Sequence, residues 1–460
     1  MKNKKSSNSR NTIQLHKQIR TIVSFTTLVF LAKVAWLYSQ PGRGLLGADG
    51  ENYLQALSGL FKEGFFSTEG KLTYWPAGYP ILMWPISEIN TGNFVFVVGF
   101  LQSLLFAISI AYFTVEICKS TLRRFAWPIT FILNLSPTLT LNTVVIGYET
   151  TTAALLMLAV TMYMRATRLN EPTVLNFEHI FAAIAIAMSC FMQPRILLLA
   201  LGILVPYAIY RYRGSAIPIF MAFTLSIVFL APGVLMFRNY HAQGFVSIST
   251  NLGNTMNIGA GDKASGGYTN NATGVPCERI VGNAATQDSH LVKCVIKWYL
   301  SNPAHSVKLV TNKFWFHWSP WFGPNANGTM ARNPWLNFHP LKQASETASG
   351  SEMINGRVGR VISFAWVVGS LFFLCFGFYS LRRRGGSSSL LAWCLFLPVV
   401  LNTFSSLLTI GDNRFRIPTM TLSLSLQILG IYAVFNRSNF AREMDGKLRL
   451  KHANKLEVNK

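Results

Sequence analysis

Long apolar runs separated by short polar turns dominate this sequence and limit the folds open to it. A helix needs about 20 mostly apolar residues to cross the hydrocarbon of a bilayer, and backbone groups in lipid must bond within their own segment. Half of the 460 residues are apolar and only 13% are charged, which favours a polytopic membrane protein over soluble domains. We predict ten helical spans, at 21–38, 94–117, 125–141, 148–164, 180–192, 196–210, 217–237, 358–380, 390–408 and 417–435.

Three of these spans admit a second interpretation. The first could be the apolar part of a signal peptide, but no small-x-small cleavage site follows it, which favours an uncleaved anchor. The fifth and sixth spans are short, and only Gln193, Pro194 and Arg195 separate them. These two segments could therefore form a helical hairpin that does not cross the membrane fully.

The distribution of basic residues predicts the orientation of the spans. The net charge of +23 would also suit a nucleic-acid-binding protein. However, Lys and Arg gather at the chain ends and in short turns between spans, as in cytoplasmic loops, so we expect no nucleic-acid partner. With the N-terminus inside, ten spans place the basic clusters at 119–124, 165–168, 211–213, 382–384 and the C-terminal tail inside. Most carboxylates then fall outside or at the outer boundary: Asp49, Glu51, Glu63, Glu69, Glu88, Glu149, Asp262, Glu278, Asp288 and Asp412.

Charge and hydropathy divide the chain into five parts. The outer loop at 39–92 follows the first span, and apolar residues at helical spacing predict an amphipathic helix over 54–66 within it. The first 20 residues are polar and basic, and we expect them to be disordered. The parts are a cytoplasmic basic tail (1–20), an N-terminal membrane catalytic module (21–237), an extracytoplasmic loop subdomain (238–357), C-terminal membrane helices (358–435) and a second cytoplasmic basic tail (436–460).

Acidic residues at the outer ends of spans are the best candidates for chemistry. Asp49 and Glu51 lie in the stretch GADGENY, just after the first span, and Glu149 opens the fourth. Ionisable groups at such positions are usually functional when they face a cavity. The combination with nearby arginines fits sugar transfer from a phosphate leaving group: a carboxylate takes the proton of an acceptor hydroxyl, and arginines hold the phosphate. The arginines on this face are Arg195, Arg238, Arg414 and Arg416.

Each candidate also has a purely structural alternative. Asp49 could cap a helix that begins near Tyr53, although its spacing favours function. Arg414 and Arg416 could be interfacial anchors, but their position outside, against the positive-inside bias, favours binding. For four other residues a functional role and a purely structural role are equally supported: Glu51, Glu149, Arg195 and Arg238.

Two of the six cysteines could be bonded. Four of them, Cys118, Cys190, Cys375 and Cys394, lie in or beside spans and are expected to be small core residues. Cys277 and Cys294 share the loop at 238–357, where an extracytoplasmic location would permit a disulfide. From the sequence alone, a disulfide and two free thiols are equally supported. The cysteine spacing indicates neither zinc nor haem.

Four stretches in the same order resemble the GT-C superfamily of membrane glycosyltransferases, specifically its bacterial members similar to protein mannosyltransferases and the lipid A aminoarabinose transferase. The resemblance covers most of residues 20–435. The sequence departs from the family in two ways. Residues 261–263 are Gly-Asp-Lys, where the family often has Asn-Asn-Pro. We also expect no large soluble domain after the last span, so acceptor recognition is assigned to the loop at 238–357. The stretches are GADGENY (47–53) with WPAGYP (75–80), Tyr148 with Glu149, the segments 238–240, 248–253, 257–259 and 266–268, and RFRIP (414–418).

The resemblance implies an all-α polytopic GT-C-like fold of about ten transmembrane helices with a mixed outer loop subdomain. It implies inverting transfer from a polyprenyl- or dolichyl-phosphate sugar at the outer membrane boundary. Asp49 would be the base and Glu149 a supporting acid, with Glu51 as a third catalytic candidate, while Arg414 and Arg416 would hold the lipid phosphate. Some members use a divalent metal and others do not, so a requirement for Mg²⁺ or Mn²⁺ is left open. The other candidates for substrate binding are Tyr53, Tyr79, Arg195, Arg238 and Tyr268.

A transporter or flippase for a lipid-linked sugar is the alternative function. It would share the spans, the outer cations and the lipid ligand, but it would more often show paired halves with broken helices at the bilayer midplane. The sequence shows no such symmetry, and its acids cluster at one face. The acceptor (protein, lipid or glycan) stays open. We expect a multi-pass protein of the bacterial inner membrane, with the endoplasmic reticulum as the alternative.

Overall fold

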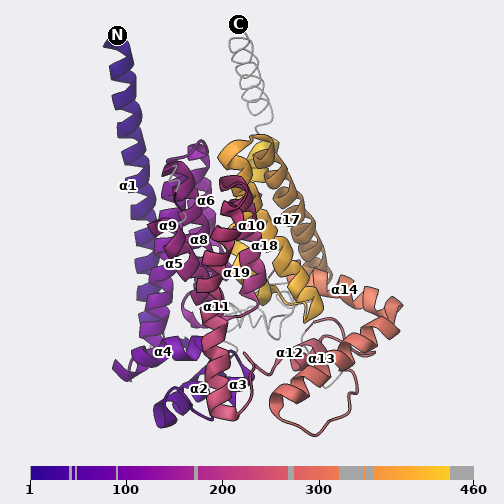
Figure 1. Cartoon of the computed structure of the whole chain (residues 1–460). Coiled ribbons are helices and arrows are strands. Elements are labelled where there is room, and N and C mark those ends of the chain that lie inside the picture. The colour runs from indigo at the N-terminus through magenta and orange to yellow at the C-terminus, as the bar shows by residue number, and fades with distance from the viewer. Residues whose placement is uncertain are drawn as a thin grey trace.

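The chain forms a helical bundle with a group of shorter helices at one end (Figure 1). The computed structural model describes residues 2–40, 44–46, 49–89, 92–169, 173, 175–267, 274–320, 347 and 356–435. In these ranges, six helices are long and apolar enough to cross a membrane: Thr12–Ser39, Phe94–Cys118, Ala216–Gln243, Arg357–Arg383, Gly386–Leu408 and Asn413–Phe435. Phe177–Met192 and Ile196–Arg211 are shorter apolar helices. The prediction of an all-α polytopic membrane protein is confirmed.

Each predicted span corresponds to helix in the bundle. The third span is divided after Leu135, since Pro137 has no N–H to continue the helical hydrogen bonds. The helices are α1 (Lys2–Ser39), α5 (Phe94–Cys118), α6 (Ala126–Leu135) with α7 (Pro137–Asn142), α8 (Tyr148–Leu169), α9 (Phe177–Met192), α10 (Ile196–Arg211), α11 (Ala216–Gln243), α17 (Arg357–Arg383), α18 (Gly386–Leu408) and α19 (Ile417–Phe435).

The first helix extends further than the sequence suggested. We expected residues 1–20 to be disordered, but α1 begins at Lys2 and continues to Ser39. Once the apolar half of a helix has formed, each further residue adds a hydrogen bond for a small cost in entropy. The basic segment therefore continues the helix of the first span.

Of the six long apolar helices, α19 is the most buried. In the apolar 18-residue stretch of each helix, 72% of the residues are buried in α19, compared with 28% in α1 and 28% in α17. It packs against α8, α17 and α18, and the core between these helices is made of Leu, Ile, Ala and Met side chains. The 3-10 turn η4 (Asn413–Arg416) leads directly into α19, so the arginines of this turn are attached to a helix that is mostly buried.

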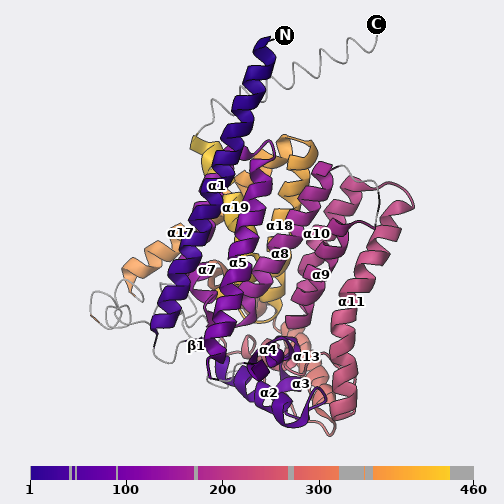
Figure 2. The ribbon, with the colours of Figure 1, turned by 90° about the vertical axis from the view of Figure 1, so that its left-hand side faces the viewer.

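Short helices from two distant parts of the chain cover one end of the bundle. Figures 1 and 2 show α2 (Gly50–Glu63), α3 (Lys71–Tyr74) and α4 (Gly78–Ile89) at the same end as α12 (Leu252–Ile258) and α13 (Ala284–Ser301), opposite the start of α1. The amphipathic helix predicted at 54–66 is α2, which buries Tyr53, Leu57 and Leu60. The outer loop and the loop subdomain therefore share one face, as the predicted topology requires.

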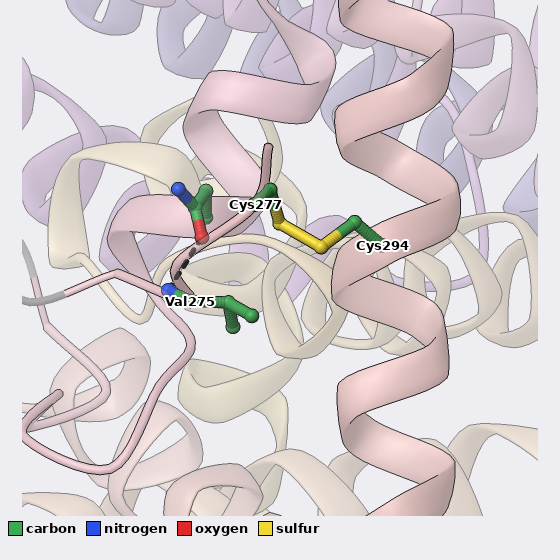
Figure 3. Close-up of a disulfide and its surroundings, with 4 residues drawn as sticks. Val275, Cys277 and Cys294 are labelled. Carbon is green, nitrogen blue, oxygen red and sulfur yellow. Dashed lines mark hydrogen bonds between the residues drawn. A yellow bond between two sulfur atoms is a disulfide. The ribbon is translucent and has the colours of Figure 1, made fainter. Parts of the chain in front are cut away.

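A disulfide braces the loop subdomain (Figure 3). Cys277 and Cys294 are bonded, with their Cα atoms 6.1 Å apart. The bond ties the extended segment around Val275 to α13, beside α14 (Pro303–Trp318). Of the two alternatives that the sequence left open, the structure has the disulfide.

We expect loss of this disulfide to loosen α13 without unfolding the bundle. The bond closes a loop with a sequence separation of 17 residues, and a crosslink of that size stabilises a fold by about 3 kcal/mol. In the double variant Cys277→Ser/Cys294→Ser, hydrogen exchange of α13 amides should become faster. Cys375→Ser, which removes an exposed free thiol, is the matched control. Unchanged exchange in α13 would contradict the prediction.

Candidate active site

A two-residue parallel sheet aligns the two segments that carry the acids. Strand β1 (Leu45–Leu46) pairs with β2 (Val145–Ile146), so that Leu46 lies opposite Ile146. Asp49 follows the first strand by three residues, and Glu149 follows the second by the same number. The strands run in the same direction, so both acids leave the sheet at the same edge.

Asp49 and Glu149 share one guanidinium group. Arg414 Nη1 lies 2.7 Å from Asp49 Oδ2, and Arg414 Nε pairs with Glu149 Oε1. All three residues are buried. Asp49 is the N-cap residue of α2, yet its side chain makes no capping hydrogen bond. Its carboxylate therefore serves this cluster and not the helix end.

Several contacts hold Arg414 in place. Its backbone N–H donates to Asp412 Oδ1 at 2.9 Å, and Asn402 Nδ2 donates to the carbonyl of Phe415 at 2.7 Å. Burial raises the pKa of the Asp412 carboxyl to about 7. Just before this turn, Gly411 lies so close to the backbone of Lys313 on α14 that a Cβ would not fit. The turn is thus held from α14 and α18.

Tyr79 positions the backbone that leads to Glu149. Its hydroxyl donates to Gln102 Oε1 at 2.7 Å and accepts the backbone N–H of Gly147 at 2.8 Å. Its ring also lies edge-on against Tyr53, with 4.9 Å between the ring centroids. Tyr79 was predicted to bind substrate, and in the structure it joins α4, α5 and the start of α8.

A cavity of about 450 Å³ lies beside this cluster. Tyr53, Tyr148 and Phe415 are in its wall. Each of them neighbours a member of the cluster: Tyr148 precedes Glu149, Phe415 follows Arg414, and the Tyr53 N–H donates to the Asp49 carbonyl at 3.0 Å. The opposite wall comes from 247–255 and α13. The cavity therefore lies between the membrane module and the loop subdomain.

Arg195 supplies a cation to the cavity wall. It lies between α9 and α10, and its guanidinium carbon is 4.4 Å from the centroid of the Phe415 ring. In the described part of the chain, its Nε and Nη2 are buried and have no hydrogen-bond partner. Buried donors without partners are rare and costly, so this guanidinium is suited to an anionic ligand.

The other predicted site residues lie elsewhere. Glu51 is exposed on the first turn of α2. Arg416 is buried, donates from Nη1 to the carbonyl of Trp318 at 2.8 Å and stacks on that indole. Arg238 is fully buried against carbonyls of the outer loop. Tyr268 lies outside the described residues.

Sequence reasoning missed several residues of the cavity wall. Asp288 is one: its Oδ1 accepts the N–H of Gly253 at 2.7 Å, and burial raises the pKa of this carboxyl. It was counted among the outer acids, but nothing in its local sequence set it apart. Trp75 and Phe415 lie within the motifs WPAGYP and RFRIP, and Gln193 lies beside Arg195. These motifs could have identified them.

Comparison with known proteins gives limited similarity. No protein-family model matches the sequence, and no curated protein matches it. Similar solved structures include the archaeal oligosaccharyltransferase AglB from Archaeoglobus fulgidus in complex with an inhibitory peptide and a dolichol-phosphate, and the Archaeoglobus fulgidus oligosaccharyltransferase in the apo form. Each has 12% sequence identity and a TM-score of 0.49, covering 93% and 94% of this chain, respectively.

The chain spans about half the length of these two proteins, 52% in each case. Both are described as oligosaccharyltransferases. With 12% identity and a TM-score below 0.5, this likeness carries no argument about the activity, which has to be inferred from the residues of this chain.

Proposed function

We propose that this chain is an integral membrane glycosyltransferase that moves a sugar from a polyprenyl-phosphate donor to an acceptor on the extracytoplasmic face. The observation that carries the proposal is the cavity of about 450 Å³ at the outer end of the bundle. Arg195, whose Nε and Nη2 have no hydrogen-bond partner, lines this cavity, and the buried carboxylates of Asp49 and Glu149 lie beside it, outside its wall. A lipid-linked sugar phosphate offers the matching groups: an anion, a ring with hydroxyls and an apolar chain.

Arg195 binds the phosphate of the donor. Its Nε and Nη2 are free to form two parallel charge-assisted hydrogen bonds, a geometry that suits phosphate oxygens. The Phe415 ring beneath the guanidinium holds it in plane by a cation–π contact. Aromatic side chains in the same wall, Tyr53, Tyr148 and Trp75, offer flat surfaces for the sugar.

Asp49 acts as the general base in a single displacement. The acceptor oxygen attacks the anomeric carbon while its proton passes to Asp49. The bond between the anomeric carbon and the phosphate oxygen breaks, and its electron pair leaves with the lipid phosphate on Arg195. Because attack and departure occur on opposite faces of the sugar, the configuration inverts. Glu149 and Arg414 orient Asp49 throughout.

A flippase for the same lipid would also need an anion site, but it would need that site to open to both sides of the membrane. The cavity lies between the membrane module and the loop subdomain, and α13, which contributes Asp288 to its wall, lies at the end of the bundle opposite the start of α1 (Figure 2). This position favours transfer at one face. We place the protein in the bacterial inner membrane, with a protein, lipid or glycan as acceptor.

Replacing Arg195 by Gln should weaken donor binding about 10- to 100-fold, since hydrogen bonds to charged groups contribute about 1.5–3 kcal/mol. The measurement is the KM for labelled polyprenyl-phosphate hexoses and pentoses in proteoliposomes, together with direct binding of polyprenyl phosphate to purified protein. Arg213→Gln, a change at an exposed arginine, is the control and should change neither value.

Three outcomes separate the functions. Sugar transfer by the wild type with a raised donor KM in Arg195→Gln supports the proposal. Labelled lipid that crosses to the other leaflet without transfer would support the flippase instead. Transfer with an unchanged KM in Arg195→Gln would place the phosphate elsewhere, with Arg416 as the next candidate.

A further inference from the structure

The charge balance of the acid cluster points to a role for Arg414 beyond binding substrate. Asp49 and Glu149 come from elements a hundred residues apart in the chain, and they meet on one guanidinium. Two carboxylates that share a site repel each other. Buried charges are also costly unless they are paired and hydrogen-bonded. A cation between them offsets this cost, and Arg414 is placed to do so.

A divalent metal ion is the other group that could bridge two such acids. Mg²⁺ and Ca²⁺ prefer several oxygen ligands, mostly carboxylates, carbonyls and water. Among the described residues, no group of three or more His, Cys, Asp and Glu side chains is placed to hold a metal ion. Asp49 and Glu149 each have a carboxylate oxygen paired with Arg414. The residues present do not fit a divalent cation, because the guanidinium occupies the bridging position.

The surroundings keep the guanidinium in this position. The Arg414 N–H is bonded to Asp412, the carbonyl of Phe415 is bonded to Asn402, and the turn continues into α19, the most buried of the six long apolar helices. A long arginine at a surface would sample many rotamers, but Arg414 is only 9% exposed. A charge that is fixed before substrate arrives can stabilise a reaction without reorganising.

We propose that Arg414 takes the place of a divalent cation between Asp49 and Glu149, so that this site works without metal and removal of the guanidinium creates a metal site. The inference has a catalytic half, that the site works without metal, and a binding half, that removal of the guanidinium creates a metal site. The catalytic half rests on the proposed function, since it concerns the base of that reaction. The binding half does not, because metal affinity can be measured on purified protein without any transfer.

The test measures Mn²⁺ binding by electron paramagnetic resonance and calorimetry. The wild type should bind no Mn²⁺ at this site, and Asp49→Asn should leave its Mn²⁺ titration unchanged. Arg414→Ala should gain a single Mn²⁺ with a dissociation constant on the order of 10⁻⁴–10⁻³ M, as at weak oxygen-ligand sites. Adding Asp49→Asn to Arg414→Ala should remove that gain. Arg360→Ala, which removes an exposed arginine, should gain nothing.

Two results would overturn the inference. The first is a wild-type Mn²⁺ site that Asp49→Asn abolishes. The second is a folded Arg414→Ala protein that binds no more Mn²⁺ than the wild type. Because the alanine variant could lose its fold, Arg414→Gln, which is closer in shape and equally uncharged, is measured alongside it.

Transfer assays test the catalytic half. Wild-type transfer should be unchanged by a chelator of divalent cations, whereas transfer lost in chelator and restored by Mn²⁺ would contradict the inference. If the wild type transfers no sugar under any condition, the proposed function fails. The Mn²⁺ titrations then still decide whether Arg414 replaces a cation.

Discussion

Sugar transfer should slow by roughly 100-fold or more when Asp49 is replaced by Asn, the loss typical of removing a general base. Asn keeps the size of the side chain but cannot accept the proton of the acceptor hydroxyl. The measurement is the rate of transfer from labelled polyprenyl-phosphate sugars at saturating donor. Donor binding should persist, because Arg195 and not Asp49 is proposed to hold the phosphate.

Glu51→Gln is the matched control for this variant. It changes an acid only two residues away, on the same helix, but Glu51 is exposed and lies outside the ion-pair cluster. Its rate should equal that of the wild type. A wild-type rate in Asp49→Asn would move the base elsewhere, with Glu149 next in line, and a loss in Glu51→Gln alone would assign the base to Glu51.

Replacement of Arg238 by Leu should lower the free energy of unfolding by about 5 kcal/mol or more, since its three hydrogen bonds to carbonyls come from a charged donor and contribute about 1.5–3 kcal/mol each. Arg238 donates from Nε to the Phe65 carbonyl at 3.1 Å, from Nη1 to the Leu72 carbonyl at 3.2 Å and from Nη2 to the Ser67 carbonyl. Leucine would leave these buried carbonyls without a donor. The first segment to open should be the outer loop around α3.

The measurement is thermal unfolding in detergent together with hydrogen exchange of residues 64–74. Arg213→Leu, at an exposed arginine, should have little effect on either. Arg238→Lys keeps the charge but has a single donor group, so it should recover only part of the stability. Unchanged stability with weakened donor binding would instead support the substrate-binding role predicted from the sequence.

The membrane spans could be predicted because hydropathy is a property of each segment by itself. A run such as 94–117 has to form a helix in lipid whatever surrounds it, and α5 follows it within one residue. The helix over 54–66 could likewise be predicted from its apolar spacing, and α2 begins only four residues earlier. We did not predict that α1 extends back to Lys2. A polar segment can continue a helix once the adjacent segment is helical, and the polar segment by itself does not show this.

The chemistry of the candidate site could be predicted only in part. The sequence identified Asp49, Glu149, Arg195 and Arg414 by residue type and by their position at span ends. It could not show that three of them form one cluster while Arg195 keeps free donors. Both statements depend on distances between residues that are hundreds of positions apart, and no local pattern contains such distances.

By itself, then, the sequence determined the membrane class, the spans and the kinds of side chain at the outer face, since these follow from local hydropathy and charge. Only the tertiary structure decided which charges meet. The pairing of Leu46 with Ile146 aligns Asp49 with Glu149, and burial then selects Arg414 as their common partner. The physical reason is that the energy of a buried charge depends on its distance to other charges, and folding alone sets those distances.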